Sequence, residues 1–437
     1  MLKRILAAFL LLTLLLPTAC AAVVPTDTQM RGVWVSAIYN LDYPSKGTTS
    51  ADTLRKEADT ILNRCAELGF NTVFLQVRPT ADAYYKSDIY PWSRYLTGKQ
   101  GTAPSGNFDP LTYWVAEAHK RGMELHAWIN PYRVTRAGED EWQAVSDQNP
   151  AKQHPDWVIR QGENYYFDPA VPEVRQMVVD GALEIVNNYD VDGIHLDDYF
   201  YPEGDFDDAA SFTRYGAGFS DLGDWRRNNV NLLISALNGT LHKADADISF
   251  GVSPAGIWDN AKDHTGGSAT DGYSSYAQSY ADSLYWVENG LVDYICPQVY
   301  WEIGFEKADF EVLLDWWSDA VKDTGVKLYI GIADYRSAEA TDTTSKWYGS
   351  AEIERQLAMI DTTGKAAGTV HFRFGSVDGS QALSSAIKKH FETTPAPVTP
   401  SAPETPQAPS ENTTPKEADP ASLFDIFSLF LYSITHA

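Results

Sequence analysis

The sequence predicts an α/β protein, a (β/α)8 TIM barrel with long insertions in the loops that follow its strands. Three observations favour this fold. Eight apolar, strand-like segments alternate with eight helical segments between residue 31 and about residue 392, as the buried parallel strands of a barrel alternate with their helices. Several strand-like segments end at a proline, which cannot continue a ladder. The chain of 437 residues is long enough for one barrel and its extensions.

The expected elements alternate regularly along the chain. Strands are expected at residues 31–36, 72–78, 124–130, 191–202, 247–253, 292–302, 327–334 and 368–374. Helices are expected at residues 53–68, 110–121, 172–188 and 222–243, after residue 273, and at 308–324, 350–361 and 379–390. Helix-boundary residues support this assignment, since Gly69 follows the first helix, Asp109 precedes the second and Pro172 opens the third. The long loop 132–170 is expected to help build a substrate cleft.

Composition divides the chain into five parts. These are a signal peptide at 1–22, a linker at 23–30, the barrel at 31–392, a Pro-, Thr- and Ser-rich linker at 393–420 and an apolar segment at 421–437. The first part has a charged start and an apolar run too short to span a membrane, as secretion signals do. The second linker is expected to be disordered. The apolar C-terminal segment is a poor membrane span, so it is expected to lie on a membrane, dock on the barrel or bind a partner.

Cys20 leaves two outcomes open for the signal peptide. It is a candidate for lipidation as in bacterial lipoproteins, although Pro17 stands where the usual motif has leucine. Cleavage after Ala21 or Ala22 is the alternative. Either outcome predicts an exported protein, located in the cell envelope or outside the cell.

Composition also excludes several classes of function. The net charge of −25 argues against nucleic acid as a partner, because polyanions would be repelled. The sequence has no cysteine–histidine cluster with metal-ligand spacing, no phosphate-binding glycine loop and no Gly-x-Ser-x-Gly nucleophile turn. No cofactor and no metal are therefore expected, and membrane contact is expected only through a lipid anchor or the C-terminal segment. We expect a monomer whose partner is a glycan substrate, because 13 Trp and 24 Tyr provide faces for sugar rings.

The stretch 191–202 is the centre of the predicted active site. Its first half is an apolar strand and its second half carries two aspartates among aromatic residues. Because side chains alternate along a strand, His195, Asp197 and Tyr199 share one side and Asp198 faces the other. We therefore expect one aspartate to face the barrel axis and the other to face a neighbouring element.

Catalytic groups of such barrels lie at the carboxyl ends of the strands. The candidates there are Trp34, Arg78, Asn130, Tyr132, His195, Asp197, Asp198, Tyr199, Tyr201, Gln298, Tyr300, Trp301, Glu302, Asp334 and Arg373. Carboxylates surrounded by aromatic residues are typical of glycoside hydrolase active sites, in which one carboxyl is protonated and another is ionised.

Roles can be assigned to the carboxylates as hypotheses. Asp197 is the expected ionised partner, with His195 and Arg78 near enough to hold its charge. Glu302 is the expected acid, because neighbouring aromatic side chains would desolvate it and raise its pKa. Asp198 is the third catalytic candidate, held in reserve for either role together with Asp334.

Each of these residues also has a purely structural interpretation. Asp197 could cap a helix, and Glu302 could be a solvated loop residue. Arg78 and Arg373 could form ion pairs inside the barrel mouth. Trp34 could fill the barrel instead of contacting sugar. These alternatives remain open at the level of sequence.

Five ordered motifs resemble the bacterial glycosyl hydrolase-like 10 family. They are Arg31-Gly32-Val33-Trp34-Val35, Phe74-Leu75-Gln76-Val77-Arg78-Pro79, His126-Ala127-Trp128-Ile129-Asn130-Pro131, Gly193-Ile194-His195-Leu196-Asp197-Asp198-Tyr199 and Pro297-Gln298-Val299-Tyr300-Trp301. The resemblance implies a secreted or lipid-anchored barrel glycosidase that acts on cell-wall glycan, namely peptidoglycan strands without their stem peptides. His195 and Asp197 also fit the spacing at the α-amylase nucleophile, with His in place of Arg. Tyr199 stands where chitinase-like barrels have their catalytic Glu, which argues against chitinase chemistry.

The expected function is therefore hydrolysis of peptidoglycan-type, N-acetylated glycan strands by carboxylate acid and base catalysis. Two alternatives remain at this point: a non-catalytic glycan-binding barrel of the cell envelope, and an exported glycosidase for another polysaccharide. The exact linkage and the retaining or inverting outcome are left open, because the sequence does not give the separation of the carboxyls.

Overall fold

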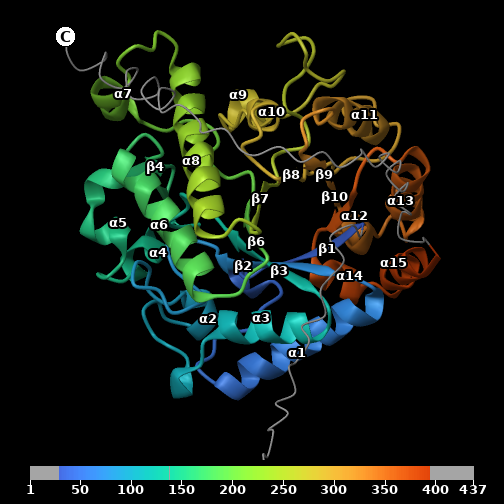
Figure 1. Ribbon diagram of the computed structural model, residues 1–437, viewed down its shortest axis with the longest axis horizontal. Coiled ribbons are helices and arrows are strands. Elements are labelled where there is room, and N and C mark those ends of the chain that lie inside the picture. Colours follow the sequence, from blue (N-terminus) through green and yellow to red (C-terminus); the bar gives the residue numbers. More distant parts are fainter. Residues whose placement is uncertain (1–28, 137, 394–437) are drawn as a thin grey trace, which may run out of the picture. The chain divides into compact units, whose positions relative to one another are not determined.

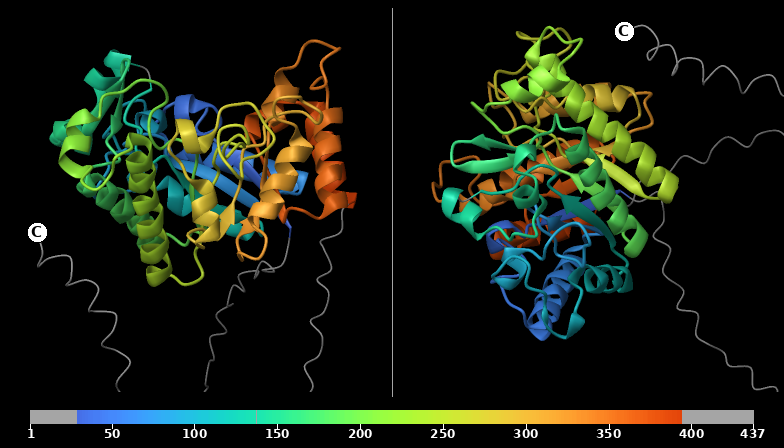
Figure 2. Two further views of the ribbon diagram at one scale, coloured as in Figure 1. Left: turned by 90° about the horizontal axis from the view of Figure 1, so that it is seen from above. Right: turned by 90° about the vertical axis from the view of Figure 1, so that its left-hand side faces the viewer.

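The computed structural model describes residues 29–136 and 138–393, which form the barrel that the sequence predicts. Figure 1 shows the strands at the centre and the helices around them, and Figure 2 shows the same arrangement from two further sides. The predicted signal peptide, Cys20, nearly all of the second linker and the C-terminal segment lie outside the described residues. Among the residues described, no helix is both long and apolar enough to cross a membrane.

The described residues contain one nine-stranded parallel sheet with the order β10-β11-β1-β2-β3-β6-β7-β8-β9. Its strands are β1 (Met30–Val35), β2 (Thr72–Arg78), β3 (Glu124–Ile129), β6 (Gly193–Leu196), β7 (Ser249–Val252), β8 (Tyr294–Ile295), β9 (Lys327–Leu328), β10 (Ile330–Ile332) and β11 (Gly368–His371). The seventh predicted strand is split, because only Tyr329 separates β9 from β10. Tyr329 N–H donates to Ile295 O at 2.9 Å and Gly331 N–H to Pro297 O at 2.9 Å. These bonds bring the two ends of the strand order together and close the barrel.

Helices follow the strands in the predicted order. Those at the predicted positions are α1 (Ala51–Leu68), α3 (Pro110–Lys120), α6 (Pro172–Asn188), α8 (Leu222–Ala244), α10 (Ser283–Glu288), α11 (Phe310–Ala320), α13 (Ala351–Thr363) and α15 (Gln381–Thr393). Further helices are η1 (Ile38–Asn40), α2 (Arg94–Thr97), η2 (Ser105–Asn107), α4 (Gly138–Ala144), α5 (Pro150–Gln153), η3 (Pro155–Trp157), α7 (Ala209–Tyr215), α9 (Ser275–Gln278), α12 (Asp334–Glu339) and α14 (Phe374–Gly379). The predicted boundary signals are present: Asp109 accepts a hydrogen bond from Thr112 N–H, and Gly69 takes a φ of 88°. Both are typical of helix ends.

The long insertion after β3 contains a small antiparallel hairpin. Its strands are β4 (Val158–Gln161) and β5 (Asn164–Phe167). Backbone bonds from Val134 and Thr135 to Tyr165 O, both 3.0 Å, tie the first part of the insertion to this hairpin. The insertion is thus an ordered wall beside the carboxyl ends of the strands.

The barrel interior is filled and is not a pore. Its buried side chains include Met30, Trp34, Phe74, Trp128, Tyr294, Cys296, Tyr329 and Val370. Two glycines make room for the large rings: a Cβ on Gly193 would lie 2.4 Å from His126 Nδ1, and one on Gly251 would lie 2.2 Å from the Tyr294 ring. Cys296 and Cys65 are buried free thiols.

Gly251→Ala tests this packing directly. The added methyl group would overlap a fully enclosed tyrosine ring, so we expect a loss of about 2–4 kcal/mol in the free energy of unfolding. The control is Gly239→Ala, at an exposed position of α8 where a Cβ meets nothing within 4 Å. Alanine there should add about 0.5–1 kcal/mol. Urea denaturation measures both, and equal effects would contradict the packing argument.

Candidate functional site

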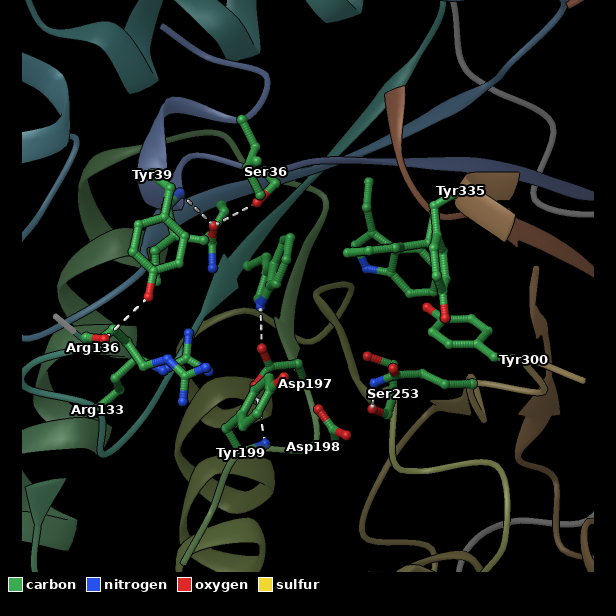
Figure 3. A pocket seen from close by; sticks show the side chains of 17 residues that line it. Ser36, Tyr39, Arg133, Arg136, Asp197, Asp198, Tyr199, Ser253, Tyr300 and Tyr335 are labelled. Carbon is green, nitrogen blue, oxygen red and sulfur yellow. Dashed lines mark hydrogen bonds between the residues drawn. The ribbon is translucent and has the colours of Figure 1, made fainter. Parts of the chain in front are cut away.

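A pocket of about 380 Å³ opens at the carboxyl ends of the strands. Figure 3 shows the side chains that line it. They are Trp34, Ser36, Ile38, Tyr39, Leu41, Gln76, Trp128, Arg133, Arg136, Asp197, Asp198, Tyr199, Ser253, Gln298, Tyr300, Tyr335 and Phe372. Aromatic rings form one wall, and Asp197 and Asp198 are the carboxylates among these lining residues. This is the place at which barrel enzymes hold their active sites.

Both aspartates of the central stretch line the pocket, which differs from the expected division between two faces. The reason is that β6 ends at Leu196. Both aspartates therefore lie beyond the ladder, where the alternation of side chains no longer applies. Asp197 is buried and Asp198 is half-buried at the pocket surface.

A directed chain of hydrogen bonds ends at Asp197. The backbone N–H groups of Ala37 and Ile38 donate to Gln76 Oε1 at 2.9 and 3.0 Å. The other end of that amide must therefore donate, and Gln76 Nε2 lies 2.8 Å from Asn130 Oδ1. Asn130 Nδ2 in turn donates to Asp197 Oδ2 at 2.5 Å. Because every step fixes the next, Asp197 receives a donor that favours its ionised form.

Further groups act on the charge of Asp197. Trp128 Nε1 donates to Oδ2 at 3.2 Å, and Tyr199 N–H donates to Oδ1 at 3.3 Å. Burial raises the pKa of the Asp197 carboxyl above its ordinary value, and the Arg133 charge is the largest of the influences that lower it. Asp197 is thus a desolvated carboxylate whose negative charge is supported from several sides.

The pKa of Asp198 is raised as well, with the charge of its neighbour as a second cause. Burial, followed by the negative charge of Asp197, raises the pKa of Asp198 to about 7, although the Gln298 side chain acts to lower it. Two neighbouring carboxyls whose surroundings separate their proton affinities are the arrangement from which acid and base roles arise. Below about pH 7 Asp198 therefore carries a proton.

Arg133, which sequence reasoning missed, supplies the positive charge that Arg78 was expected to supply. Its guanidinium lies 4.1 Å from the centre of the Tyr199 ring. Its Nε is buried without a hydrogen-bond partner among the described residues. Arg133 follows soon after the end of β3, so the same strand-end rule that selected Asn130 would have found it.

Arg78 lies outside the pocket because the pairing of β2 with β3 shifts register between Gln76 and Arg78. Such an irregularity changes the direction of the following side chain. Gln76 therefore takes the pocket position, whereas Arg78 is buried 4.5 Å from the Tyr90 ring centre. It packs against Gly181 of α6, where a Cβ would meet Arg78 Nη1 at 2.6 Å.

His195 lies below the pocket and does not contact Asp197 by a hydrogen bond that the structure shows. Trp34 Nε1 donates to its Nε2 at 3.2 Å, so the proton of the ring is on Nδ1. That nitrogen lies 3.0 Å from the Tyr294 hydroxyl, which also reaches His126 at 3.0 Å. Burial lowers the pKa of His195 well below its ordinary value, and the ring is neutral. This network holds Trp34 at the pocket floor, so Trp34 both fills the barrel and lines the site.

Glu302 does not line the pocket, so the expected meeting of Asp197 and Glu302 over one opening is not found. Its carboxylate accepts a hydrogen bond from Trp347 Nε1 at 2.9 Å. The loop after β8 is held against α13, where buried Glu352 accepts from Ile303 N–H at 2.7 Å. Trp301 O is bound from the same helix at 3.1 Å. These bonds direct both residues away from Asp197.

The remaining candidates separate into two groups. Tyr199, Gln298 and Tyr300 line the pocket, and Asn130 stands directly behind Asp197. Outside the lining are Tyr132 and Tyr201, which are buried, and Asp334 and Arg373. The Asp334 carboxylate lies 3.0 Å from His371 Nδ1. The Arg373 guanidinium donates to the Asp42 carboxylate and, at 3.0 Å, to Leu41 O. Arg373 thus forms one of the structural ion pairs that remained open in the sequence.

Tyr39 and Leu41 form an exposed rim that no sequence signal indicated. Their exposed fractions are 48% and 43%, which is high for large apolar side chains. Tyr39 and Asn40 both have a φ of 56°, a left-handed conformation that costs energy in non-glycine residues and is often kept at functional sites. Backbone conformation of this kind is not visible in a sequence.

The described residues contain no group of three or more His, Cys, Asp or Glu side chains that could hold a metal ion.

The comparisons with known proteins place the chain in a family. The family model of glycosyl hydrolase-like 10 matches residues 29–349. The chain belongs to this family. Glycosyl hydrolase YngK of Bacillus subtilis is 41% identical over 375 residues, which cover 84% of this chain and 72% of that protein. Glycosyl hydrolase DigH of Escherichia coli is 40% identical over 374 residues, 80% of this chain and 85% of the relative.

Solved structures share the fold at low sequence identity. The glycoside hydrolase domain of PgaB (BpsB) from Bordetella bronchiseptica matches with a TM-score of 0.56 and 11% identity, over 84% of this chain and 99% of that one. An endo-beta-1,4-mannanase from Thermotoga petrophila matches with a TM-score of 0.50 and 12% identity, over 84% and 76%. Family membership and barrel fold together support glycan hydrolysis as the general class of reaction.

The raised pKa of Asp198 predicts how an Asn variant changes stability with pH. A carboxyl whose pKa is about 7 in the folded state and about 4 when unfolded costs the wild type stability as pH rises from about 4 through 7. Asparagine does not titrate, so the melting temperature of Asp198→Asn should match the wild type at pH 4.5 and exceed it by about 2 °C or more at pH 8.5.

Asp205→Asn, at an exposed aspartate of the following loop, is the matched control for this experiment. It should change the melting temperature equally at the two pH values. If Asp198→Asn also changed the melting temperature equally at pH 4.5 and pH 8.5, Asp198 would be ionised at both pH values. That result would contradict the raised pKa of this carboxyl. Calorimetric scans supply the measurement.

Proposed function

We propose that this protein hydrolyses glycosidic bonds in peptidoglycan-type, N-acetylated glycan strands, as an exported enzyme of the cell envelope. The observation that carries the proposal is the pair Asp197 and Asp198, whose carboxyls line one pocket with different proton affinities. Membership of a glycosyl hydrolase-like family and the relatives named glycosyl hydrolases support it. The secretion pattern at 1–22 and the family resemblance are the grounds for a cell-wall substrate and for lipidation of Cys20 as one route of attachment.

In the proposed reaction Asp198 is the acid. It donates its proton to the glycosidic oxygen as the bond to the anomeric carbon breaks, so that the leaving sugar departs as a neutral alcohol. Asp197 is the ionised partner, which stabilises the positive charge that develops on the sugar ring. Water adds to the anomeric carbon, and the proton it releases restores the acid. The donors on Asp197 keep it ionised while its neighbour remains protonated.

The rest of the pocket suits a sugar ring. Trp34 and Phe372 lie 5.9 Å apart between ring centres, and Tyr300 and Tyr335 lie 5.8 Å apart. Such rings offer apolar faces to the C–H surfaces of a pyranose and hydroxyl groups at their edges. Ser253 and Gln298 add polar groups within the same lining, which is the mixture that small-molecule sites need for orientation.

Replacing the two carboxyls one at a time tests the proposal. Purified protein should release short saccharides from peptide-free glycan strands, and Asp197→Asn should lower kcat at least about 1,000-fold. Asp198→Asn should lower it by about 100-fold or more and remove the decline in activity above about pH 7, because that decline reports the acid losing its proton. Reducing-end assays across pH supply the measurement.

Three results would oppose this assignment. Full activity in Asp197→Asn would remove the proposed mechanism. Tight binding of the strands by wild-type protein without any product would favour a glycan-binding barrel. Hydrolysis of an unrelated polysaccharide with no action on peptide-free strands would change the substrate. Asp205→Asn, on the adjacent exposed loop, should behave as wild type in every arm.

Asn130→Ala tests the hydrogen-bond chain behind Asp197. Loss of the 2.5 Å donor should raise the pKa of Asp197 and move the acid limb of the kcat profile upward by about one unit. Asn229→Ala is the control, because Asn229 is also buried and donates to Tyr201 at 3.0 Å outside the pocket. Asn229→Ala should reduce the free energy of unfolding without moving the acid limb of the kcat profile. A shift shared by both variants would indicate a general loosening of the fold instead.

A further inference from the structure

A second pocket, of about 460 Å³, shares Tyr39 with the catalytic pocket. Its lining consists of Tyr39, Asn40, Lys46, Gly47, Arg94, Tyr95, Gly98, Lys99, Gln100 and Ala144. Tyr39 lines both pockets, so the two are neighbours along one rim. The lining contains three cationic side chains and no carboxylate, in a protein whose net charge is −25. The local charge of this pocket is thus opposite in sign to the net charge of the chain.

The positive charge of the second pocket is not neutralised within its lining. Lys46 and Lys99 are exposed, and among the described residues neither ammonium has an ion pair or hydrogen bond in the structure. Arg94 differs, because it lies 3.3 Å from Glu141. The nearby carboxylate of Glu57 accepts from the backbone and hydroxyl of Ser45 at 2.7 and 2.8 Å. The two lysines therefore remain available to an anion.

The catalytic pocket has a matching cation on its own side of Tyr39. Arg133 is 4% exposed and is directed into that pocket, as Figure 3 shows. Its Nε has no hydrogen-bond partner among the described residues, and no carboxylate lies within ion-pair distance of its guanidinium there. A buried, incompletely bonded guanidinium costs free energy unless a ligand completes its bonds. Unsatisfied positive charge thus lies on both sides of the same tyrosine.

Tyr39 is held as a fixed ridge between the pockets. Its hydroxyl donates to Arg136 O at 3.3 Å, and its ring meets the Tyr95 ring edge-on at 5.9 Å. The next residue, Asn40, donates from Nδ2 to Tyr95 O at 2.6 Å and to Pro44 O at 2.9 Å. An exposed aromatic side chain held this firmly can stack a sugar ring at little cost in side-chain entropy.

From these features we infer that the second pocket is an anion-binding subsite for the glycan, in which Lys46 and Lys99 bind a carboxylate carried by a sugar. The inference rests on the proposed function and extends it. The glycan chain would cross Tyr39, with one sugar in the catalytic pocket near Arg133 and a carboxylate-bearing sugar beyond the ridge. Strands whose lactyl groups are free acids provide such carboxylates, whereas an amide at the same place provides no charge.

The test compares glycan strands that differ only in this charge. Peptide-free strands are prepared with free carboxyls and with the carboxyls converted to amides. The full-length wild type should show about tenfold higher kcat/KM on the charged strands at low salt, as expected for two partly exposed charge contacts. The double variant Lys46→Gln/Lys99→Gln should lose that preference through a higher KM, keep its kcat, and match the wild type on amidated strands.

The matched control is Lys243→Gln/Lys322→Gln, which removes the same charge from two exposed lysines elsewhere, one in α8 and one just after α11. It should behave as wild type. A double variant at Lys46 and Lys99 that retains the preference would overturn the subsite. Competition by millimolar inorganic phosphate, without any preference for charged strands, would show an anion site for another ligand and would also overturn it.

Binding measurements separate the subsite from the proposed hydrolysis. If the wild type cleaves no strand, the proposed function fails, and calorimetric titration with the same strands still tests the pocket. Tighter binding of charged strands that weakens from 50 to 300 mM salt, and disappears in the double variant, would support the subsite. Equal binding of charged and amidated strands by the wild type would refute it.

Discussion

A directed chain of amides supports a negative charge on Asp197. It begins at the backbone N–H groups of Ala37 and Ile38, passes through Gln76 and Asn130, and crosses from β1 through β2 and β3 to β6. Each amide has one donating and one accepting end, so the first contact determines the direction of all the others. The barrel therefore positions a hydrogen-bond donor against the Asp197 carboxylate, and the positive charge of Arg133 adds to its effect.

This arrangement separates the two aspartates chemically although they are neighbours in sequence. Asp197 receives several hydrogen-bond donors, whereas burial and then the negative charge of Asp197 raise the pKa of Asp198 to about 7. Below the pair, neutral His195 is fixed by Trp34 and Tyr294, which adds rigidity without adding charge. The hydrogen bonds of His195 thus hold Trp34 in the pocket lining. The amide chain through Gln76 and Asn130 influences the protonation of Asp197.

The apolar runs and their prolines were sufficient to predict the barrel, because burial on both faces dictates composition. Strand-end position identified the pair at Asp197, but it failed where local structure intervenes. A register shift turns Arg78 outward, and bonds to α13 carry Glu302 away from the pocket. The exposed position of Tyr39 depends on a left-handed backbone conformation at residues 39 and 40. These three features arise from pairing and packing between distant segments, which a single sequence does not display.

The loop after β1 contacts both the hydrogen-bond chain of Asp197 and the two pockets. Its first N–H groups set the orientation of Gln76, and its next residue, Tyr39, separates the two pockets. Asp42 closes the same loop by accepting from Ser36 N–H at 2.8 Å and Gly375 N–H at 2.9 Å, and from the Arg373 guanidinium. A ligand that moved Tyr39 would therefore strain the contacts that hold Gln76 in place. One short segment thus contributes both to the lining of the two pockets and to the orientation of Gln76.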